Sequence, residues 1–495
     1  MNDRCKICIF YHVAEREKDS CLMIADSIKI LNSNAEVIVE EFYQGMYHAF
    51  LYRPDVILTI PPRDDNTANR LMILKKIVHC AVLSLMTEGY FGSFAEEKCQ
   101  VAVGSNQYSP FLIDKYLFWG EKTKDCLVSV LKKNKKIINE SRAQTVGYIY
   151  YDVDKVKDFF DETKLPTDIQ KWREDFRKRI LVLTGFPGAE YTEKDLQIMS
   201  DFKCYGIKGK EQEYRQEVKE WEKRRKRYVE FRKKYLDCVI AFAGAYPDMG
   251  ILVKMHPVEM EKFFIGEKYQ CYHELEQYKN IILLKESVLV GRILPFADTV
   301  VHYGSTAGME AYIYNVPTVQ LFDPIYPEQP GEPGFCIYES TVRIDINDWE
   351  LFKKTVSENI EMRHLPSVEQ VLKEQFNWTR EKQKEYHPTK TYAEIILDFV
   401  GKGQKIEDDA YYRSALHSLQ GRDIKRYYLD QIMKNISSRK RLDIETKSYQ
   451  NVLKELEISL GESIILILRI VGGRIKRTFK LKGGSGYVEN GNRRK

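Results

Sequence analysis

The sequence predicts an α/β protein with two Rossmann-like, doubly wound domains that face a cleft, followed by a helical, basic C-terminal extension. Three observations support this fold class. The chain has 495 residues, 43% of them hydrophobic, which is too long for one ordinary core. Short apolar runs alternate with helix-length segments, which is the rhythm of βαβ units. A charged segment that contains a proline divides these runs into two series.

The first series of predicted strands lies before residue 153. Several of these strands are continuous apolar runs, as expected for a sheet that helices cover on both faces. The runs are KICIFYH (6–12), EVIVEEF (36–42), DVILTIPP (55–62), AVLSLMTEG (81–89), CQVAVGS (99–105) and TVGYIYYD (145–152). We therefore expect a first domain over residues 1–175.

The second series begins after the charged segment 161–179. Its runs are RILVLTGFPG (179–188), GILVKMHPV (250–258), NIILLKES (280–287), DTVVHYGS (298–305) and PTVQLFDP (317–324). Between the first two, apolar and aromatic residues recur at helical spacing over 212–244, which predicts a long amphipathic helix. We expect a second domain over residues 176–400 and an extension over residues 401–495.

The bulk composition excludes several classes of protein. The net charge of +5, with a pI near 8.4, is too small to favour nucleic acid as a partner. Of the ten cysteines, Cys5 and Cys8 come closest to a zinc-finger pair, but they lie in the apolar, strand-like run KICIF, which indicates free thiols in a reduced, cytoplasmic compartment. No apolar run approaches the length of a membrane span, and the N-terminus does not read as a secretory signal.

A histidine-proline pair ends the predicted strand GILVKM. Pro257 cannot continue a strand ladder, and it disfavours the α conformation for His256. The imidazole should therefore stand at the carboxyl end of the strand, where open α/β sheets bind ligands. There it could donate a hydrogen bond to a phosphate; the alternative is a structural histidine that satisfies a loop carbonyl.

A short turn with two hydroxyl residues follows the predicted strand DTVVH. Ser305 and Thr306 should start a short helix that stops at Asn315, and Gly304 lets the backbone approach a ligand. A helix start of this kind favours an anion. Glu310 falls one helical turn later and could accept hydrogen bonds from a ribose. A plain N-cap with a solvated Glu310 is the alternative.

The stretch 251–322 that carries these two motifs resembles the nucleotide-binding half of GT-B glycosyltransferases that build bacterial surface carbohydrates. Similar enzymes include capsule-type Kdo transferases, bacterial sialyltransferases and CDP-glycerol glycerophosphotransferases. His256 and Pro257 match their HP motif. Ser305 and Thr306 match their second motif, with threonine in place of the second serine. The resemblance implies that these residues hold the phosphate of a CMP- or CDP-linked donor, with no metal ion and no cofactor.

The resemblance also implies roles for two positions outside these motifs. In GT-B proteins the loop after the first strand of the second domain lies near the donor phosphate, which makes Gly185 a donor contact. Bacterial sialyltransferases use an acidic residue followed by glycine as their base. Glu88–Gly89, after the run AVLSLM, is similar, so we expect Glu88 to act as the base from the acceptor-side domain. A loop glutamate in water, or a helix cap, is the alternative.

The C-terminal stretch is basic. From Arg469 onward it contains nine Lys or Arg residues and one acidic residue, Glu489, and the apolar run IILILRIV overlaps its start. Such a combination could hold the protein on an anionic cytoplasmic leaflet. A packed helix followed by a soluble tail is the alternative.

The sequence therefore predicts a metal-independent glycosyltransferase at the cytoplasmic face of a membrane. The donor would be a nucleotide sugar, with a CMP-Kdo-like donor as first choice, and the acceptor a growing surface polysaccharide or a lipid-linked saccharide. The predicted catalytic residues are Glu88 and His256, and the predicted donor contacts are Gly185, His256, Pro257, Gly304, Ser305, Thr306 and Glu310. Alternatives are a CDP-polyol phosphotransferase, a nucleotide-sugar 2-epimerase and a non-catalytic assembly protein.

Overall fold

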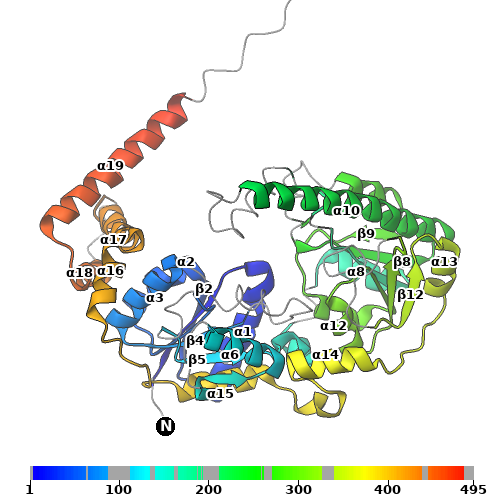
Figure 1. The fold of residues 1–495 in the computed structure, drawn as a ribbon, viewed down its shortest axis with the longest axis horizontal. Coiled ribbons are helices and arrows are strands. Elements are labelled where there is room, and N and C mark those ends of the chain that lie inside the picture. The colour runs from blue at the N-terminus through cyan, green and yellow to red at the C-terminus, as the bar shows by residue number, and fades with distance from the viewer. Residues whose placement is uncertain are drawn as a thin grey trace, which may run out of the picture.

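The structure is a computed structural model of the chain, in which two α/β domains lie side by side (Figure 1). The structure describes residues 4–62, 65–86, 112–133, 140–160, 165–186, 188–190, 192, 211–257, 259–260, 270–325, 339–437 and 444–483. Helices from the C-terminal part of the chain lie on the outer side of the first domain, away from the second (Figure 1).

The first domain is built on a six-stranded sheet with the strand order β2-β1-β3-β4-β5-β6, and every neighbouring pair is parallel. The strands are β1 (Lys6–Tyr11), β2 (Glu36–Glu41), β3 (Val56–Thr59), β4 (Ala81–Leu85), β5 (Lys115–Phe118) and β6 (Ala143–Thr145). Its helices include α1 (Asp19–Leu31), α2 (Phe42–Tyr52), α3 (Asp65–Val78), α6 (Glu121–Lys133) and α7 (Val153–Phe159). Side chains of α2 and α3 fill the core on one face, and those of α1 fill the core on the other.

The second domain repeats this plan with the strand order β12-β11-β10-β7-β8-β9, again all parallel. The strands are β7 (Lys178–Leu183), β8 (Met249–Lys254), β9 (Ile281–Leu283), β10 (Thr299–His302), β11 (Thr318–Phe322) and β12 (Val342–Asp345). The predicted long helix is α10 (Glu211–Ala245), which covers one face together with α13 (Trp349–Ser357). The helices α8 (Thr167–Asp175) and α12 (Ala307–Ile313) cover the other face.

Most predicted strands are present, with two differences. The run TVGYIYYD is not one strand, because β6 ends at Thr145 and residues Ile149–Tyr151 form a 3-10 turn. Gly147, with a φ of 95°, separates the two. The short strands β5 and β12 were not predicted. The predicted strand 99–105 lies outside the described residues.

The two domains share a hydrophobic core. The residues Met309, Tyr312 and Ile313 of α12 belong to the same buried cluster as strand residues of the first sheet. The helix α14 (Pro366–Phe376) joins this cluster and packs against both α6 and α12. The next helix, α15 (Pro388–Asp398), lies within the range predicted for the second domain, yet it packs against α1 of the first. The chain therefore returns to the first sheet before residue 400.

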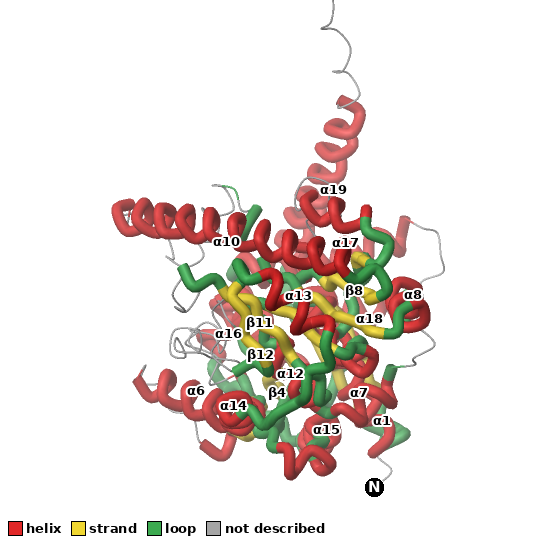
Figure 2. The backbone as a smooth tube through the Cα atoms, turned by 90° about the vertical axis from the view of Figure 1, so that its right-hand side faces the viewer, coloured by secondary structure: helices red, strands yellow, loops and turns green. Residues whose placement is uncertain are grey.

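The C-terminal extension is helical, as predicted. It contains α16 (Asp409–His417), α17 (Leu419–Ser437), α18 (Ile444–Glu455) and α19 (Leu460–Gly483). The first three pack against α2 and α3, and α19 rests on α17 and then runs beyond the body of the protein (Figure 2). Two doubly wound parallel domains with a helical extension confirm the predicted fold class. Among the described helices, none combines the length and hydropathy needed to cross a bilayer.

Candidate functional site

A cavity of about 380 Å³ lies between the two domains, at the carboxyl ends of their strands. The first domain contributes residues from the loop after β1, the segment after β6 and the helix α7. The second domain contributes the end of β8, the segment after β9, and α12. The lining residues are Val13, Tyr148, Tyr150, Val156, Lys254, His256, Pro257, Ser287, Val288, Leu289, Val290, Gly291 and Glu310. The predicted residues His256, Pro257 and Glu310 therefore meet in one cavity.

A lysine and a glutamate interact electrostatically in this cavity. Burial lowers the pKa of Lys254, at the end of β8, and the charge of Glu310 opposes that change. Burial raises the pKa of Glu310 to about 7, although the Lys254 ammonium acts to lower it. The glutamate therefore changes charge near neutral pH. Lys254 was not among the predicted site residues, because a lysine within the strand pattern GILVKM does not reveal that α12 will bring a carboxylate near it.

The His256 side chain keeps part of its surface accessible to solvent where it opens into the cavity between the domains. Burial and the neighbouring Lys254 ammonium lower its pKa to about 4. The imidazole is therefore neutral at neutral pH. A neutral ring can donate one hydrogen bond to an anion, and it would gain a proton more readily once an anion lies beside it.

A buried glutamate fixes the loop that carries His256. The Glu259 carboxylate is 0% exposed and accepts hydrogen bonds from the backbone N–H of His256 at 3.1 Å and of Phe186 at 2.8 Å. It also accepts from the hydroxyl groups of Thr184 at 2.6 Å and Tyr272 at 2.9 Å. Glu259 thus ties the loop after β7 to the loop after β8. Sequence reasoning assigned it no role, although it follows His256 by only three residues.

The first-domain wall of the cavity is held in a similar way. The buried Glu17 carboxylate accepts hydrogen bonds from the backbone N–H of His12 at 2.6 Å and of Val13 at 3.2 Å. Tyr150 accepts a hydrogen bond from the backbone N–H of Ser20 at 3.1 Å. Both walls are therefore positioned by the protein itself.

The predicted phosphate-binding turn lies outside the cavity lining. Ser305 Oγ accepts from the backbone N–H of Ala307 at 3.2 Å, and the N–H groups of Gly308 and Met309 donate to carbonyls in the same turn. The N–H groups of Ala307, Gly308 and Met309 are therefore engaged within the turn. Donor binding by Ser305 and Thr306 stays a prediction. Asn315 does end the helix in the left-handed conformation, with φ of 59°, as predicted.

Gly304 and Gly185 also lie outside the lining, in two loops that pack together. Gly304 has a φ of 148°, and its N–H donates to Nδ1 of the buried His302 at 3.1 Å. This bond gives His302 a structural role at the turn. A Cβ on Gly185 would lie 2.9 Å from the Tyr303 hydroxyl, so glycine is needed for the close approach of these loops. Donor binding by either glycine stays a prediction.

An unused hydroxyl group lies behind the cavity wall. The Tyr314 oxygen is buried and has no hydrogen-bond partner among the described residues. It lies so close to Gly291, a lining residue, that a Cβ there would come within 2.8 Å of it. Such a group is costly to bury without a partner.

The predicted base, Glu88, lies outside the described residues. Its role stays a prediction. In the described part of the chain, no group of three or more His, Cys, Asp or Glu residues has the geometry of a metal site.

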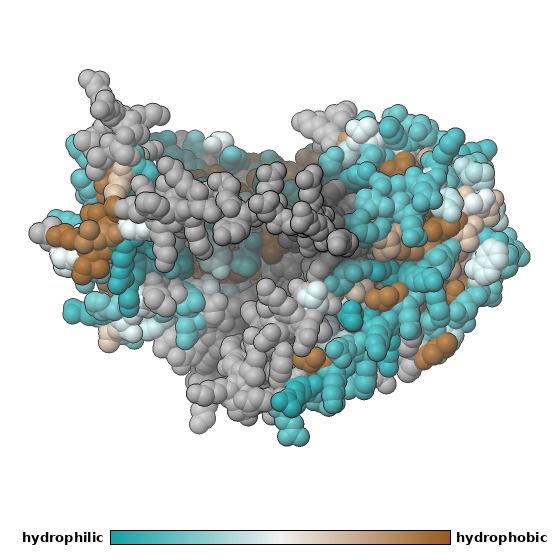
Figure 3. Space-filling model, turned by 90° about the horizontal axis from the view of Figure 1, so that it is seen from above, coloured by the Kyte–Doolittle hydropathy of each residue, from teal (hydrophilic) through white to brown (hydrophobic). Residues whose placement is uncertain are grey.

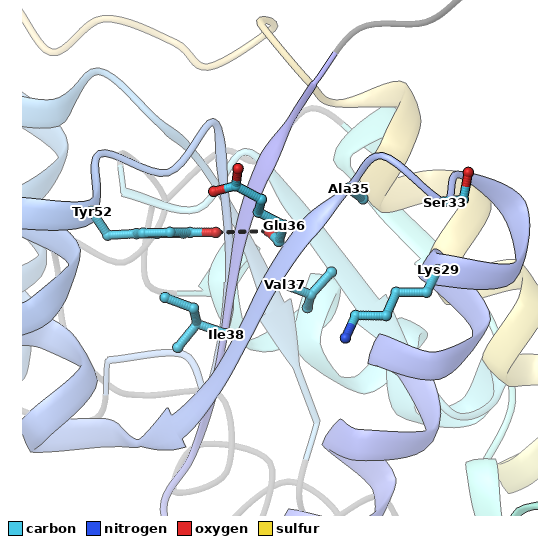
Figure 4. Close-up of a pocket in the computed structure, with 7 residues that line it drawn as sticks. All are labelled: Lys29, Ser33, Ala35, Glu36, Val37, Ile38 and Tyr52. Atoms are coloured by element: carbon cyan, nitrogen blue, oxygen red, sulfur yellow. Dashed lines mark hydrogen bonds between the residues drawn. The ribbon is translucent and has the colours of Figure 1, made fainter.

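A second hollow, of about 650 Å³, lies on the open surface at the outer edge of the first sheet (Figure 4). It is lined by Lys29, Ser33, Ala35, Glu36, Val37, Ile38 and Tyr52, and the Tyr52 hydroxyl donates to the Glu36 carbonyl at 2.9 Å. All of these residues belong to the first domain. The cavity between the domains is therefore the better candidate for a site, because both domains contribute polar groups to it.

Comparisons with known proteins identify only distant structural likenesses. No protein-family model matches the sequence, and no curated protein matches it. UDP-GlcNAc 2-epimerase from Methanocaldococcus jannaschii is 12% identical, with a TM-score of 0.45 over 79% of this chain and 99% of that chain. A variant of the wall teichoic acid polymerase TagF is 10% identical, with a TM-score of 0.48 over 81% and 89%. HepE from Anabaena, in complex with UDP-glucose, is 11% identical, with a TM-score of 0.40 over 80% and 100%. These TM-scores all fall below 0.5, so the likenesses do not indicate a function for this chain.

Proposed function

We propose that this protein is a glycosyltransferase of the GT-B type that binds a nucleotide-activated sugar in the cavity between its domains. The observation that carries this proposal is the position of Lys254, His256 and Glu310, which line one wall of a cavity whose opposite wall belongs to the other domain. A donor on one domain and an acceptor on the other would meet there.

The charges in the cavity suit a phosphate group. Burial makes it costly for Lys254 to carry its charge, and an anion beside it would remove that cost. The same anion would favour protonation of His256, whose pKa of about 4 leaves the ring neutral in the empty site. Glu310 would accept hydrogen bonds from the hydroxyl groups of the nucleotide ribose. A CMP-Kdo-like donor is our first choice and a CDP-linked polyol our second, both from the sequence resemblance.

The transfer step would need no metal ion. The acceptor oxygen forms a bond to the anomeric carbon, and the bond from that carbon to the phosphate oxygen breaks. The leaving nucleotide keeps the electron pair, and Lys254 and His256 would stabilise its charge. The proton of the acceptor hydroxyl goes to a base, for which Glu88 remains our candidate.

A second candidate function is 2-epimerisation of a nucleotide sugar. The observation that favours it is the raised pKa of Glu310, about 7, which suits a group that must both take up and release a proton. An epimerase needs no acceptor. Incubation of the protein with donor alone, followed by product analysis, separates the two activities.

The first experiment is calorimetric titration with CMP, CDP and UDP. Binding of one nucleotide identifies the donor class, whereas no binding to any of them would favour a non-catalytic assembly protein. We expect Lys254→Met to weaken the binding at least about tenfold, because a charge-assisted hydrogen bond contributes roughly 1.5–3 kcal/mol. Lys279→Met is the matched control, since Lys279 is exposed and lies outside the cavity. Equal affinities in the two variants would contradict the assignment.

The second experiment tests the chemistry. We expect His256→Ala to abolish transfer while the protein stays folded. His417→Ala, at an exposed position in the last turn of α16, should leave transfer unchanged. Transfer near the wild-type rate in a folded His256→Ala protein would rule out the proposed role of this histidine.

We further propose that the acceptor is a surface polysaccharide or a lipid-linked saccharide at the cytoplasmic face of a membrane. The basic C-terminal segment supports this placement.

A further inference from the structure

The helix α19 presents an apolar face to solvent. Of eleven exposed large hydrophobic side chains in the described residues, four fall within eight residues of this helix. They are Ile464 (51% exposed), Ile465 (54%), Leu468 (65%) and Val471 (37%). Figure 3 shows an apolar patch at its left edge, on the side of the molecule that carries the extension helices.

The opposite face of the same helix attaches it to the protein. Leu466 and Ile470 are buried against Leu429 of α17. The Lys425 ammonium of α17, itself buried, donates to the Glu462 carboxylate of α19 at 2.8 Å. This anchor is built on one side of the helix, so the apolar face on the other side has a fixed direction.

The exposed residues form one stripe. Ile464, Leu468 and Val471 follow one another at spacings of four and three residues, which places them on the same face of a helix, and Ile465 lies beside them. The backbone of α19 continues as a helix to Gly483 and runs beyond α17, away from the body of the protein (Figure 1). The stripe is therefore not covered by the two domains.

The charge of the helix indicates what covers this face. The helix contains six basic residues and one acidic residue, Glu462, which is paired with Lys425. The basic residues are Arg469, Arg474, Lys476, Arg477, Lys480 and Lys482. A second copy of the helix would bring two such sets of positive charges together. An anionic lipid surface, in contrast, complements both the charge and the apolar stripe.

We propose that α19 docks on an anionic lipid bilayer, with Ile464, Ile465, Leu468 and Val471 in the interfacial region, and that the net positive charge of the helix favours the anionic surface. This inference deepens the membrane placement proposed above and is independent of the proposed chemistry. Docking through α19 would bring the first domain, which carries the extension, close to a lipid-linked acceptor.

The test is co-sedimentation of the full chain with vesicles of phosphatidylcholine alone and of phosphatidylcholine mixed with phosphatidylglycerol, without any donor. We expect binding to the anionic vesicles only, with weaker binding at high salt. Leu468→Glu should reduce the partition coefficient at least about tenfold, because it places a charge in the stripe. Ile30→Glu is the matched control, because Ile30 is 71% exposed on α1 and should leave binding unchanged.

The thermal unfolding transition of the Leu468→Glu protein shows whether the variant is folded. Nucleotide titration of the same protein separates failure of docking from failure of the proposed function. The docking proposal is overturned if the wild-type protein does not bind anionic vesicles, or if the Leu468→Glu and Ile30→Glu proteins bind them equally. It is also overturned if the wild-type protein forms dimers that Leu468→Glu abolishes while vesicle binding is absent, since the stripe would then be a contact between copies.

Discussion

Replacement of Glu310 by glutamine should make the stability of the protein less dependent on pH. Burial raises the pKa of this carboxyl from 4.5 to about 7, against the opposing effect of Lys254. When the pKa of a carboxyl is higher in the folded protein than in the unfolded chain, ionisation of that carboxyl destabilises the folded protein. The contribution of Glu310 to the free energy of unfolding is therefore highest below pH 4.5 and falls as the pH rises to about 7. Glutamine has the same shape and does not titrate.

The magnitude follows from the two pKa values. At about 1.36 kcal/mol for each pKa unit, a rise from 4.5 to about 7 corresponds to a limit of about 3 kcal/mol at alkaline pH. Between about pH 5 and about pH 8, ionisation of Glu310 would lower the free energy of unfolding of the wild-type protein by roughly 2.5 kcal/mol of that limit. Glu310 is partly accessible through the cavity, and water there reduces the cost of its charge. We therefore expect a difference of about 1–2 kcal/mol.

The assay is urea unfolding of the wild-type and variant proteins at the two pH values. The free energy of unfolding of Glu310→Gln should fall less between them. Glu286→Gln is the matched control, because Glu286 is an exposed carboxyl in the loop beside the cavity. The control should follow the wild-type protein. If Glu310→Gln also follows it, burial does not raise the pKa of this carboxyl to about 7, and the proposed change of its charge near neutral pH is wrong.

Three further predictions concern residues around the site and the core of the first domain. Glu259→Gln should lower the free energy of unfolding by about 1–3 kcal/mol, because an amide nitrogen would replace an oxygen that accepts from backbone or hydroxyl donors; a thermal melt identical to that of the wild-type protein would contradict this. Lys75→Met should cost about 3 kcal/mol in chemical unfolding, since it leaves the buried Asp114 carboxylate, now 2.5 Å from the ammonium, without its counter-ion; an unchanged midpoint would show that the pair contributes nothing. In NMR titration, the His256 ring should titrate near pH 4 in the empty protein and at higher pH with nucleotide bound, and an unchanged value would place the phosphate elsewhere.

The strands of both sheets could be predicted because most of them are continuous apolar runs, the pattern of parallel strands with helices on both faces. The strands β5 and β12 were missed because each is short and includes charged residues, Lys115 in β5 and Arg343 and Asp345 in β12. The run TVGYIYYD was predicted as one strand because β-prone residues lie on both sides of Gly147, but the positive φ of Gly147 ends the strand. The strand propensity of the residues does not show at which glycine a strand will end.

Only some of the residues of the site could be predicted from the sequence. His256 and Glu310 follow strand ends, and the position of a residue after a strand can be recognised in the sequence. The position of Lys254 beside Glu310 depends on the packing of α12 next to β8, which no local pattern specifies. Glu259 was missed for another reason. A glutamate in a polar loop normally points to water, and only the folded protein shows the donors that surround it.

The two buried glutamates explain how a cavity between two domains can have fixed walls. Glu17 binds the backbone N–H of Val13 in the first domain, and Glu259 binds that of His256 in the second. Each carboxylate therefore orders a loop before any ligand arrives, so a ligand does not have to lose free energy in ordering it. The hydrophobic core that α12 shares with the first domain holds the two walls together. The groups left to respond to a ligand are then the titratable ones, Lys254, His256 and Glu310, and a phosphate should change their protonation more than it changes the backbone.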